Sequence, residues 1–443
     1  MGGNAFKAIA ADAIFPRMPP AVYEALKSSL LPILQSLYSH VIVPREAPGK
    51  KDYGDVDFVV CCPREGLTAD KVKAALRASY SVPMEGHRTS NYAIAPDAWE
   101  DVARVSEHWV AEIRESSRSD EHSEGSGTSV YLQVDVNVSA DNAQLERKAF
   151  YSSYGDLGLL LGLLAQSAGL SFSIYGLKLA EPVGSPPQTF YLSDNFTEIL
   201  SFLGLSMERW ERDFTNQDEL FRWIASSPFA VAFAERLKAS DGMPFERDRV
   251  EARPMRQNFI AFLREHRFPD RADEGHSVFA QPGNKEEKLA ATLKYFGKEK
   301  EYVAIVDAAR AATRAKAILN GTNVQEWTGV RGMPVRFILD EVKERLTSWR
   351  MHGNDGKDLD ETGDIPAWQR ALLDMTDAEV RGLTVRVKEE LDAAGKLMFD
   401  WRAAKAAKLE QKRQKELASS GVGEQETASV SGARGVQTPD SSG

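Results

Sequence analysis

Two spacings of apolar residues occur in the first half of the chain. Between Pro19 and Ser39, apolar residues recur mostly every three or four positions, which predicts an amphipathic helix with one buried face. The segments Val56–Cys62 and Tyr131–Val138 are rich in β-branched residues and predict strands. Shorter stretches add strands at Val41–Val43 and Asn91–Ile94 and a helix over Thr68–Ser79. Helices between strands predict an α+β fold with a mixed sheet.

The second half of the chain has a helical pattern from about residue 206 onward. Ala304–Leu319 is rich in alanine and ends at Asn320-Gly321, a typical stop signal. Residues 114–129 are polar and predict an exposed loop. We expect a mixed domain over 1–150, a segment with a short hairpin over 151–210 and a mostly helical domain over 211–400. Residues 401–443 begin as a charged helix and continue as a tail too polar to fold alone.

Composition is typical of a globular protein with more than one domain. The 443 residues are 42% apolar, and the net charge of −10 argues mildly against a protein dedicated to binding duplex nucleic acid. The two cysteines, Cys61 and Cys62, are adjacent and predict buried thiols in a reducing compartment, nuclear or cytoplasmic. We expect an intracellular protein, and no apolar run long enough for a membrane span occurs. The sequence gives no oligomeric state.

The most informative motif is Gly54-Asp55-Val56-Asp57, at the start of a predicted strand. Residues i and i+2 of a strand point to the same face, about 6.5–7 Å apart. Asp55 and Asp57 would therefore project into one space, where each disfavours ionisation of the other. A divalent cation relieves this repulsion, and Mg²⁺ commonly shares carboxylates with substrate phosphates. The alternative is a solvated acidic pair at a strand end.

A third carboxylate, Asp135, lies in the middle of the second predicted strand, between Val134 and Val136. A partly buried carboxylate needs a partner, because burial of an unpaired charge is unfavourable. If this strand lies beside the first, Asp135 joins Asp55 and Asp57 in a two-metal site. The alternative is a structural aspartate bound by backbone amides or an arginine.

These residues resemble the polymerase β-like nucleotidyltransferases, in which Gly-Asp-x-Asp precedes a distant strand with a single Asp. The passage Ala168–Leu177, with Tyr175-Gly176-Leu177, and the strand Thr189–Leu192 are similar to the palm-to-thumb passage of family X DNA polymerases. An acidic segment ending in Leu203-Gly204-Leu205 follows in the same order. The resemblance covers roughly residues 40–210 and implies a palm over 1–150 and a thumb-like segment over 151–210.

The resemblance implies a metal-dependent nucleotidyltransferase. Asp55, Asp57 and Asp135 would hold Mg²⁺ or Mn²⁺, and a hydroxyl acceptor, including an RNA or DNA 3′ end, would receive the nucleotidyl group of an NTP or dNTP. Pyrophosphate would leave. Around Pro254, the residues Arg253, Arg256 and Asn258 form a candidate contact with a polynucleotide, although a helix linked by salt bridges explains the arginines equally well.

The chain departs from the family where the triphosphate would bind. Pro44 and Arg45 stand where Gly-Ser is expected, and proline has no amide hydrogen to donate. Arg45, Lys50 and Lys51 supply charge for a phosphate, or are solvated loop cations. Ser152-Ser153 stands where the family has a Thr-Gly pair, and this position implies a contact with the triphosphate or sugar. The altered loop supports one rival, an inactive nucleotide- or nucleic-acid-binding scaffold of the same fold. The acidic composition suits a second, nucleotidyl transfer of a toxin–antitoxin type or to a small molecule.

Overall fold

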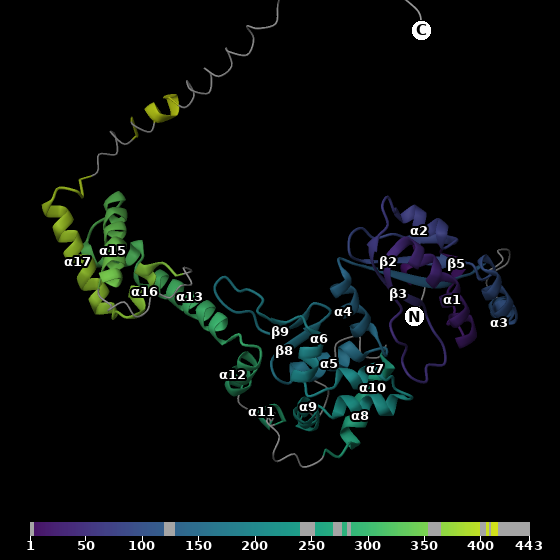
Figure 1. Ribbon diagram of the computed structural model, residues 1–443. Helices are drawn as coiled ribbons and strands as arrows, with labels where there is room; N and C mark the ends of the chain where they lie inside the picture. Colours follow the sequence, from purple (N-terminus) through teal and green to yellow (C-terminus); the bar gives the residue numbers. More distant parts are fainter. Residues whose placement is uncertain are drawn as a thin grey trace, which may run out of the picture. The chain divides into compact units, whose positions relative to one another are not determined.

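The computed structural model describes residues 4–118, 129–239, 253–268, 277–280, 285–352, 365–398, 405–406 and 409–414 (Figure 1). The chain divides into two compact units, Met1–Ile305 and Val306–Gly443. The protein is of the mixed α+β type, and its largest sheet is mixed. The boundaries expected at residues 150, 210 and 400 do not coincide with this division, which lies within helix α13 (Glu299–Ile318).

The first unit contains a five-stranded sheet with the order β2-β3-β7-β5-β4. The two central strands, β3 (Val56–Pro63) and β7 (Leu132–Ser139), are parallel. The flanking pairs are antiparallel: β2 with β3, β5 with β7, and β4 with β5. The other three strands are β2 (Tyr38–Ile42), β5 (Thr89–Ile94) and β4 (Ala78–Val82), of which β2 and β4 are the edges of the sheet.

One face of this sheet packs against helices and forms an apolar core with them. Helix α1 (Pro20–Leu37) buries Val22, Leu26 and Leu30 at the spacing of a helical face, and Val134 and Val136 of β7 belong to the same cluster. Helix α3 (Glu100–Arg118) contacts α1 and adds Val102 to this core. Successive residues of a strand point to opposite faces, so Gln133, Asp135 and Asn137 lie on the other face.

Helix α4 (Asn142–Ser152) contacts β3 and β7 and covers part of that second face. Its Leu145 packs with Val59 and Cys61 of β3. Its buried Lys148 donates to Asn137 Oδ1 at 2.7 Å and to the Val138 carbonyl at 2.8 Å. The apolar packing of α4 therefore lies toward the carboxyl ends of the central strands, and Asp57 and Asp135 lie nearer their amino ends.

The rest of the first unit is a helical region with a small antiparallel sheet. Its apolar cluster runs from Phe150 to Leu293 and includes many stacked and edge-on aromatic rings. The sheet has the order β10-β9-β8, with β8 (Leu170–Ser173), β9 (Gly176–Leu179) and β10 (Tyr191–Ser193). The helices are α5 (Leu157–Gln166), α6 (Phe196–Phe202), α7 (Met207–Glu211), α8 (Gln217–Ala225), α9 (Pro228–Ala239), α10 (Pro254–Glu265), α11 (Ser277–Ala280) and α12 (Lys285–Tyr295).

Four short elements and one helix complete the first unit as described. The turn η1 (Asn4–Phe6) brings Phe6 against Phe15, with ring centroids 4.8 Å apart. Strand β1 (Ala13–Ile14) pairs in parallel with β6 (Ser129–Val130). Helix α2 (Ala69–Ala75) follows β3, and the turn η2 (Pro96–Ala98) leads into α3.

The second unit is helical in its described residues. It comprises the end of α13 with α14 (Gly321–Thr328), α15 (Met333–His352), α16 (Ala367–Leu373) and α17 (Asp377–Ala393). Buried residues such as Ile338, Val342 and Val387 form one apolar cluster between these helices. A capping box of Thr376 and Glu379 begins α17.

Several element boundaries differ from the sequence predictions. The helix expected over Thr68–Ser79 ends at Ala75, because Arg77 adopts a left-handed φ of 54° and β4 begins at Ala78. Residues 114–118, expected in a loop, are the last residues of α3, and 119–128 lie outside the described residues. Asn320 follows α13 and also caps α14, where it accepts from the Asn323 amide at 3.0 Å. Most of the expected charged helix and the tail after residue 401 also lie outside the described residues.

Candidate active site

Asp57 and Asp135 are direct partners across the two central strands. Asp57 of β3 is in register with Asp135 of β7, and neighbouring strands lie about 4.8 Å apart. Asp55 lies two residues before Asp57. Each carboxylate interacts electrostatically with at least one of the other two. The structure therefore brings Asp55, Asp57 and Asp135 together, and we call them the carboxylate cluster.

The cluster is electrostatically unfavourable without a cation. Desolvation and then the charges of Asp55 and Asp135 raise the pKa of Asp57 to about 8. Desolvation also raises the pKa values of Asp55 and Asp135. Asp57 is nevertheless exposed to solvent and therefore accessible to a ligand.

Two side-chain amides fix the orientation of Asp135. Asn91 of β5 donates from Nδ2 to Asp135 Oδ1 at 2.7 Å, and Gln133 donates from Nε2 to the same oxygen at 2.9 Å. Both bonds favour the charged form and lower the pKa of Asp135, against the effect of desolvation. Both bonds are made to the same carboxylate oxygen, Oδ1. Within the described part of the chain, the side chains that bind Asp135 are these two amides, whereas the alternative left open by the sequence was binding by backbone amides or an arginine.

Sequence reasoning missed Asn91 and Gln133 as site residues. Asn91 was expected in a strand, and Gln133 stands two positions before Asp135, on the same face. The spacing of Gln133 from Asp135 could have predicted that the two side chains lie close together. No sequence pattern could have predicted this for Asn91, because its place opposite Asp135 depends on the pairing of β5 with β7.

A further carboxylate, Glu46, lies near the cluster and was also missed. Its charge raises the pKa values of Asp55 and Asp57. Tyr23 donates to Glu46 Oε1 at 2.7 Å, and Lys50 Nζ lies 2.6 Å from Glu46 Oε2. Lys50 also stands over the Tyr53 ring, 4.6 Å from its centroid. Its charge lowers the pKa values of Asp55 and Asp57, so Lys50 lies beside the cluster as a partial counterion.

The donor set of the cluster fits a hard divalent cation. Its ligand atoms are carboxylate oxygens, which Mg²⁺ and Mn²⁺ prefer. Among the residues that the structure describes, no group of three or more His, Cys, Asp or Glu side chains is arranged so that it could hold a metal ion by itself. Mg²⁺ at phosphate-transfer sites needs only one or two carboxylates together with substrate phosphates. Burial raises the pKa values of all three aspartates, and neighbouring carboxylates raise those of Asp57 and Asp135 further. A bound cation would oppose both effects.

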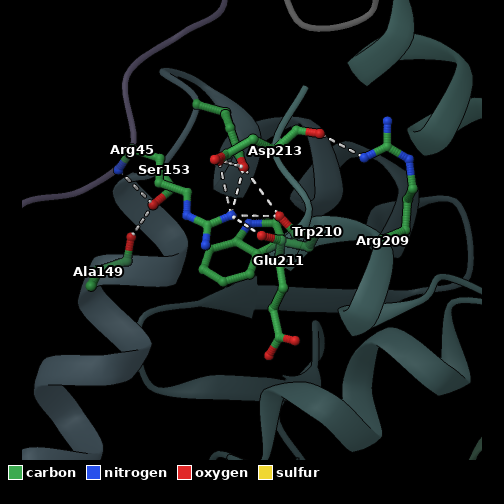
Figure 2. Close-up of polar contacts among 8 residues, drawn as sticks. Arg45, Ala149, Ser153, Arg209, Trp210, Glu211 and Asp213 are labelled. Carbon is green, nitrogen blue, oxygen red and sulfur yellow. Dashed lines mark hydrogen bonds and ion pairs between the residues drawn. The ribbon is translucent and has the colours of Figure 1, made fainter. Parts of the chain in front are cut away.

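Arg45, expected to contact a phosphate, makes internal contacts (Figure 2). Its guanidinium nitrogen Nη1 donates to the carbonyls of Trp210 and Glu211 at 2.7 and 3.0 Å, and pairs with Asp213 at 3.0 Å. The guanidinium carbon lies 4.5 Å from the centroid of the Trp210 ring. These contacts give Arg45 a structural role, and its contact with a nucleotide stays a prediction.

Ser153, also expected near the nucleotide, is buried and fully engaged. Its hydroxyl donates to the Ala149 carbonyl at 2.6 Å and accepts from the Arg45 amide at 3.1 Å (Figure 2). The Tyr154 amide in turn donates to the Arg45 carbonyl at 2.5 Å. Ser153 thus joins the loop before β3 to the end of α4. We call these residues the Arg45 junction: Arg45, Ser153, Tyr154, Trp210, Glu211 and Asp213.

The remaining residues predicted to contact a nucleotide or polynucleotide are exposed, paired within the protein or buried. Ser152 and Lys51 have exposed side chains. Arg253 pairs with Asp156 at 2.5 Å, and Arg256 is buried in α10. Asn258 donates to Gln217 at 3.4 Å. Arg253 is therefore held by an ion pair, as in the alternative of a helix linked by salt bridges, and Asn258 by a neutral hydrogen bond.

No protein-family model matches the chain, and no curated protein matches it significantly. In the part of the chain that the structure describes, no helix combines the length and apolar character needed to cross a membrane.

Proposed function

We propose that the protein is a metal-dependent nucleotidyltransferase that uses the carboxylate cluster. The observation that carries the proposal is the register of Asp57 with Asp135, which places two like charges on neighbouring positions of one sheet face beside Asp55. A fold tolerates such repulsion where the charges serve a ligand, and perturbed carboxylates of this kind concentrate at functional sites.

In the proposed reaction an acceptor hydroxyl oxygen bonds to the α-phosphorus of an NTP or dNTP. The bond from that phosphorus to the pyrophosphate oxygen breaks, and pyrophosphate leaves. Asp55, Asp57 and Asp135 would hold Mg²⁺ or Mn²⁺, which supplies charge neutralisation for the phosphates when bound. Asn91 and Gln133 keep Asp135 oriented, and the proton of the acceptor hydroxyl is released to solvent. A cation held by Asp55, Asp57 and Asp135 would keep the three carboxylates ionised, against the burial that raises their pKa values.

Lys50 is the cation best placed to meet the triphosphate. It already lies beside Asp55 and Asp57, and an incoming phosphate would compete with Glu46 for its ammonium group. The internal engagement of Arg45 and Ser153 favours one rival, an inactive scaffold of the same fold that binds nucleotide without turnover.

The test is transfer from NTPs labelled at the α-phosphate, with Mg²⁺ or Mn²⁺, to RNA, DNA or the protein itself. We expect wild type to transfer label and Asp135→Asn to lose more than about a hundredfold of the rate, because an amide cannot replace a metal-binding carboxylate. The matched control is Asp70→Asn, an exposed aspartate in α2.

Transfer that is unchanged in Asp135→Asn would refute the role of the cluster. Nucleotide binding that requires Mg²⁺ or Mn²⁺, measured by calorimetry without any turnover on these acceptors, would support the scaffold instead.

A further inference from the structure

The two cysteines at the end of β3 have their sulfur atoms side by side. Cys61 Sγ and Cys62 Sγ are 3.3 Å apart. Cys61 is buried with Val59 and Leu145 under α4, whereas Cys62 is exposed, which corrects the expectation that both thiols are buried. The pair thus consists of a protected thiol in contact with an accessible one.

This contact requires an unusual backbone. Adjacent residues of a regular strand point to opposite faces, which separates their side chains. Cys62 has a φ of 57°, the left-handed region that residues other than glycine rarely adopt. Pairing with β2 continues on both sides of it, at His40–Cys61 and Tyr38–Pro63. The left-handed residue inside an otherwise continuous ladder is what places both sulfurs together.

A left-handed residue of this kind is unfavourable and persists where the surroundings enforce it, often at functional positions. We propose that Cys61 and Cys62 form a reversible thiol–disulfide modification site that reacts with small disulfides of the glutathione class.

The reaction proceeds in two exchanges. The Cys62 thiolate attacks one sulfur of the small disulfide, a mixed disulfide forms, and one small thiolate leaves and takes up a proton. The Cys61 sulfur, as thiolate, then attacks Cys62 Sγ and displaces the second small thiolate, which takes up the proton that Cys61 lost. Two cysteine thiols are oxidised, and one small disulfide is reduced to two thiols.

The product is a strained and therefore labile disulfide. Adjacent Cα atoms are 3.80 Å apart across a trans peptide, below the usual 4.4–6.8 Å of a disulfide. Strained, accessible disulfides are more easily reduced than structural ones and suit reversible modification. Burial and the neighbouring Cys62 thiol raise the pKa of Cys61, which favours Cys62 as the first thiol to react.

The test is intact-mass spectrometry of the native full chain in glutathione buffers of increasing oxidised fraction, followed by quenching and alkylation. The chain contains only these two cysteines, so an intrachain disulfide has a single assignment. We expect a species lighter by two hydrogen atoms that loses both alkylation sites, and we expect reduced glutathione to restore them.

Two variants separate the roles of the thiols. In Cys61→Ala, we expect the exposed Cys62 to stop at the mixed disulfide with glutathione. In Cys62→Ser, we expect the buried Cys61 to stay unmodified while the chain is folded, as checked by circular dichroism. A wild type that accumulates the mixed disulfide, or that stays fully reduced in oxidised glutathione, would overturn the proposal. Neither result depends on nucleotidyl transfer.

Discussion

The carboxylate cluster and the Arg45 junction are both polar groupings in the first unit, but they differ in how their groups are satisfied. In the junction, the guanidinium of Arg45 meets carbonyls, a carboxylate and an aromatic ring, and Ser153 both donates and accepts. In the cluster, like charges face one another, and the pKa of Asp57 rises to about 8. Polar groups that the fold itself satisfies stabilise it, whereas polar groups held in mutual repulsion remain available for a ligand.

The largest expected effect comes from Asp57→Asn, which should lower activity and raise stability. We expect transfer to fall by more than about a hundredfold. The folded state binds a proton at Asp57 more tightly than the ordinary pKa of 3.8 implies. The free energy of unfolding therefore falls as pH rises from about 4 to about 8, and the penalty is complete above about 8.

The measurement is thermal unfolding with a metal chelator present. Asp57→Asn should unfold a few degrees higher than wild type near pH 9 and equally near pH 4. Asp70→Asn, which removes a favourable charge from the first turn of α2, should show no gain over wild type at either pH. A variant that is less stable than wild type at high pH would show that the cluster is a satisfied structural network like the junction.

Arg45→Ala is expected to act on stability. It removes charged hydrogen bonds to two carbonyls and the contact with Trp210, and we expect a loss of about 1.5–3 kcal/mol in the free energy of unfolding. Denaturant titration measures this loss, with the exposed Lys51→Ala as control. Unchanged stability together with a raised KM for NTP would restore the role in phosphate binding predicted from the sequence.

Asn91→Ala should weaken metal binding at the cluster. Removal of one of the two amides that orient Asp135 is expected to lower Mn²⁺ affinity by about tenfold or somewhat more, as for other groups that orient metal ligands. Calorimetric titration with Mn²⁺ measures the change. Asn91→Asp adds a negative charge beside the cluster and should raise the pKa of Asp135 further. Equal Mn²⁺ affinity in wild type and Asn91→Ala would contradict the positioning role.

The smallest effect distinguishes two adjacent serines. Ser153→Ala removes a buried hydroxyl with two partners and should lower the free energy of unfolding by about 1 kcal/mol. The exposed Ser152→Ala should leave stability unchanged. If instead Ser152→Ala raised the KM for NTP, the contact expected from the sequence would survive at that serine alone.

The apolar pattern predicted most of the elements around the site. The helix expected from Pro19 corresponds to α1, and the strands expected around Val56–Cys62 and Tyr131–Val138 correspond to β3 and β7 within a residue. These predictions succeed because burial of one face imposes a period on neighbouring residues. Boundaries near Ser79 and in residues 114–118 were wrong, because a left-handed residue ended α2 early and α3 continued through polar residues.

The roles of individual polar residues were less predictable. Asp55 and Asp57 were singled out by their spacing and Asp135 by its place within a predicted strand, whereas Glu46, Asn91 and Gln133 were not singled out. Arg45 and Ser153 were chosen by position, but the structure engages both internally. The left-handed conformation of Cys62, which creates the thiol pair, has no signature in the sequence.

The sequence by itself determined the strands, the first helix and the motif that puts two aspartates at a strand start, because these depend on residues close together along the chain. The tertiary structure alone decided that Asp135 stands opposite Asp57, that Asn91 orients it and that Arg45 binds Trp210. Strand register and side-chain pairing between distant segments are set by the packing of whole faces, which no local pattern specifies.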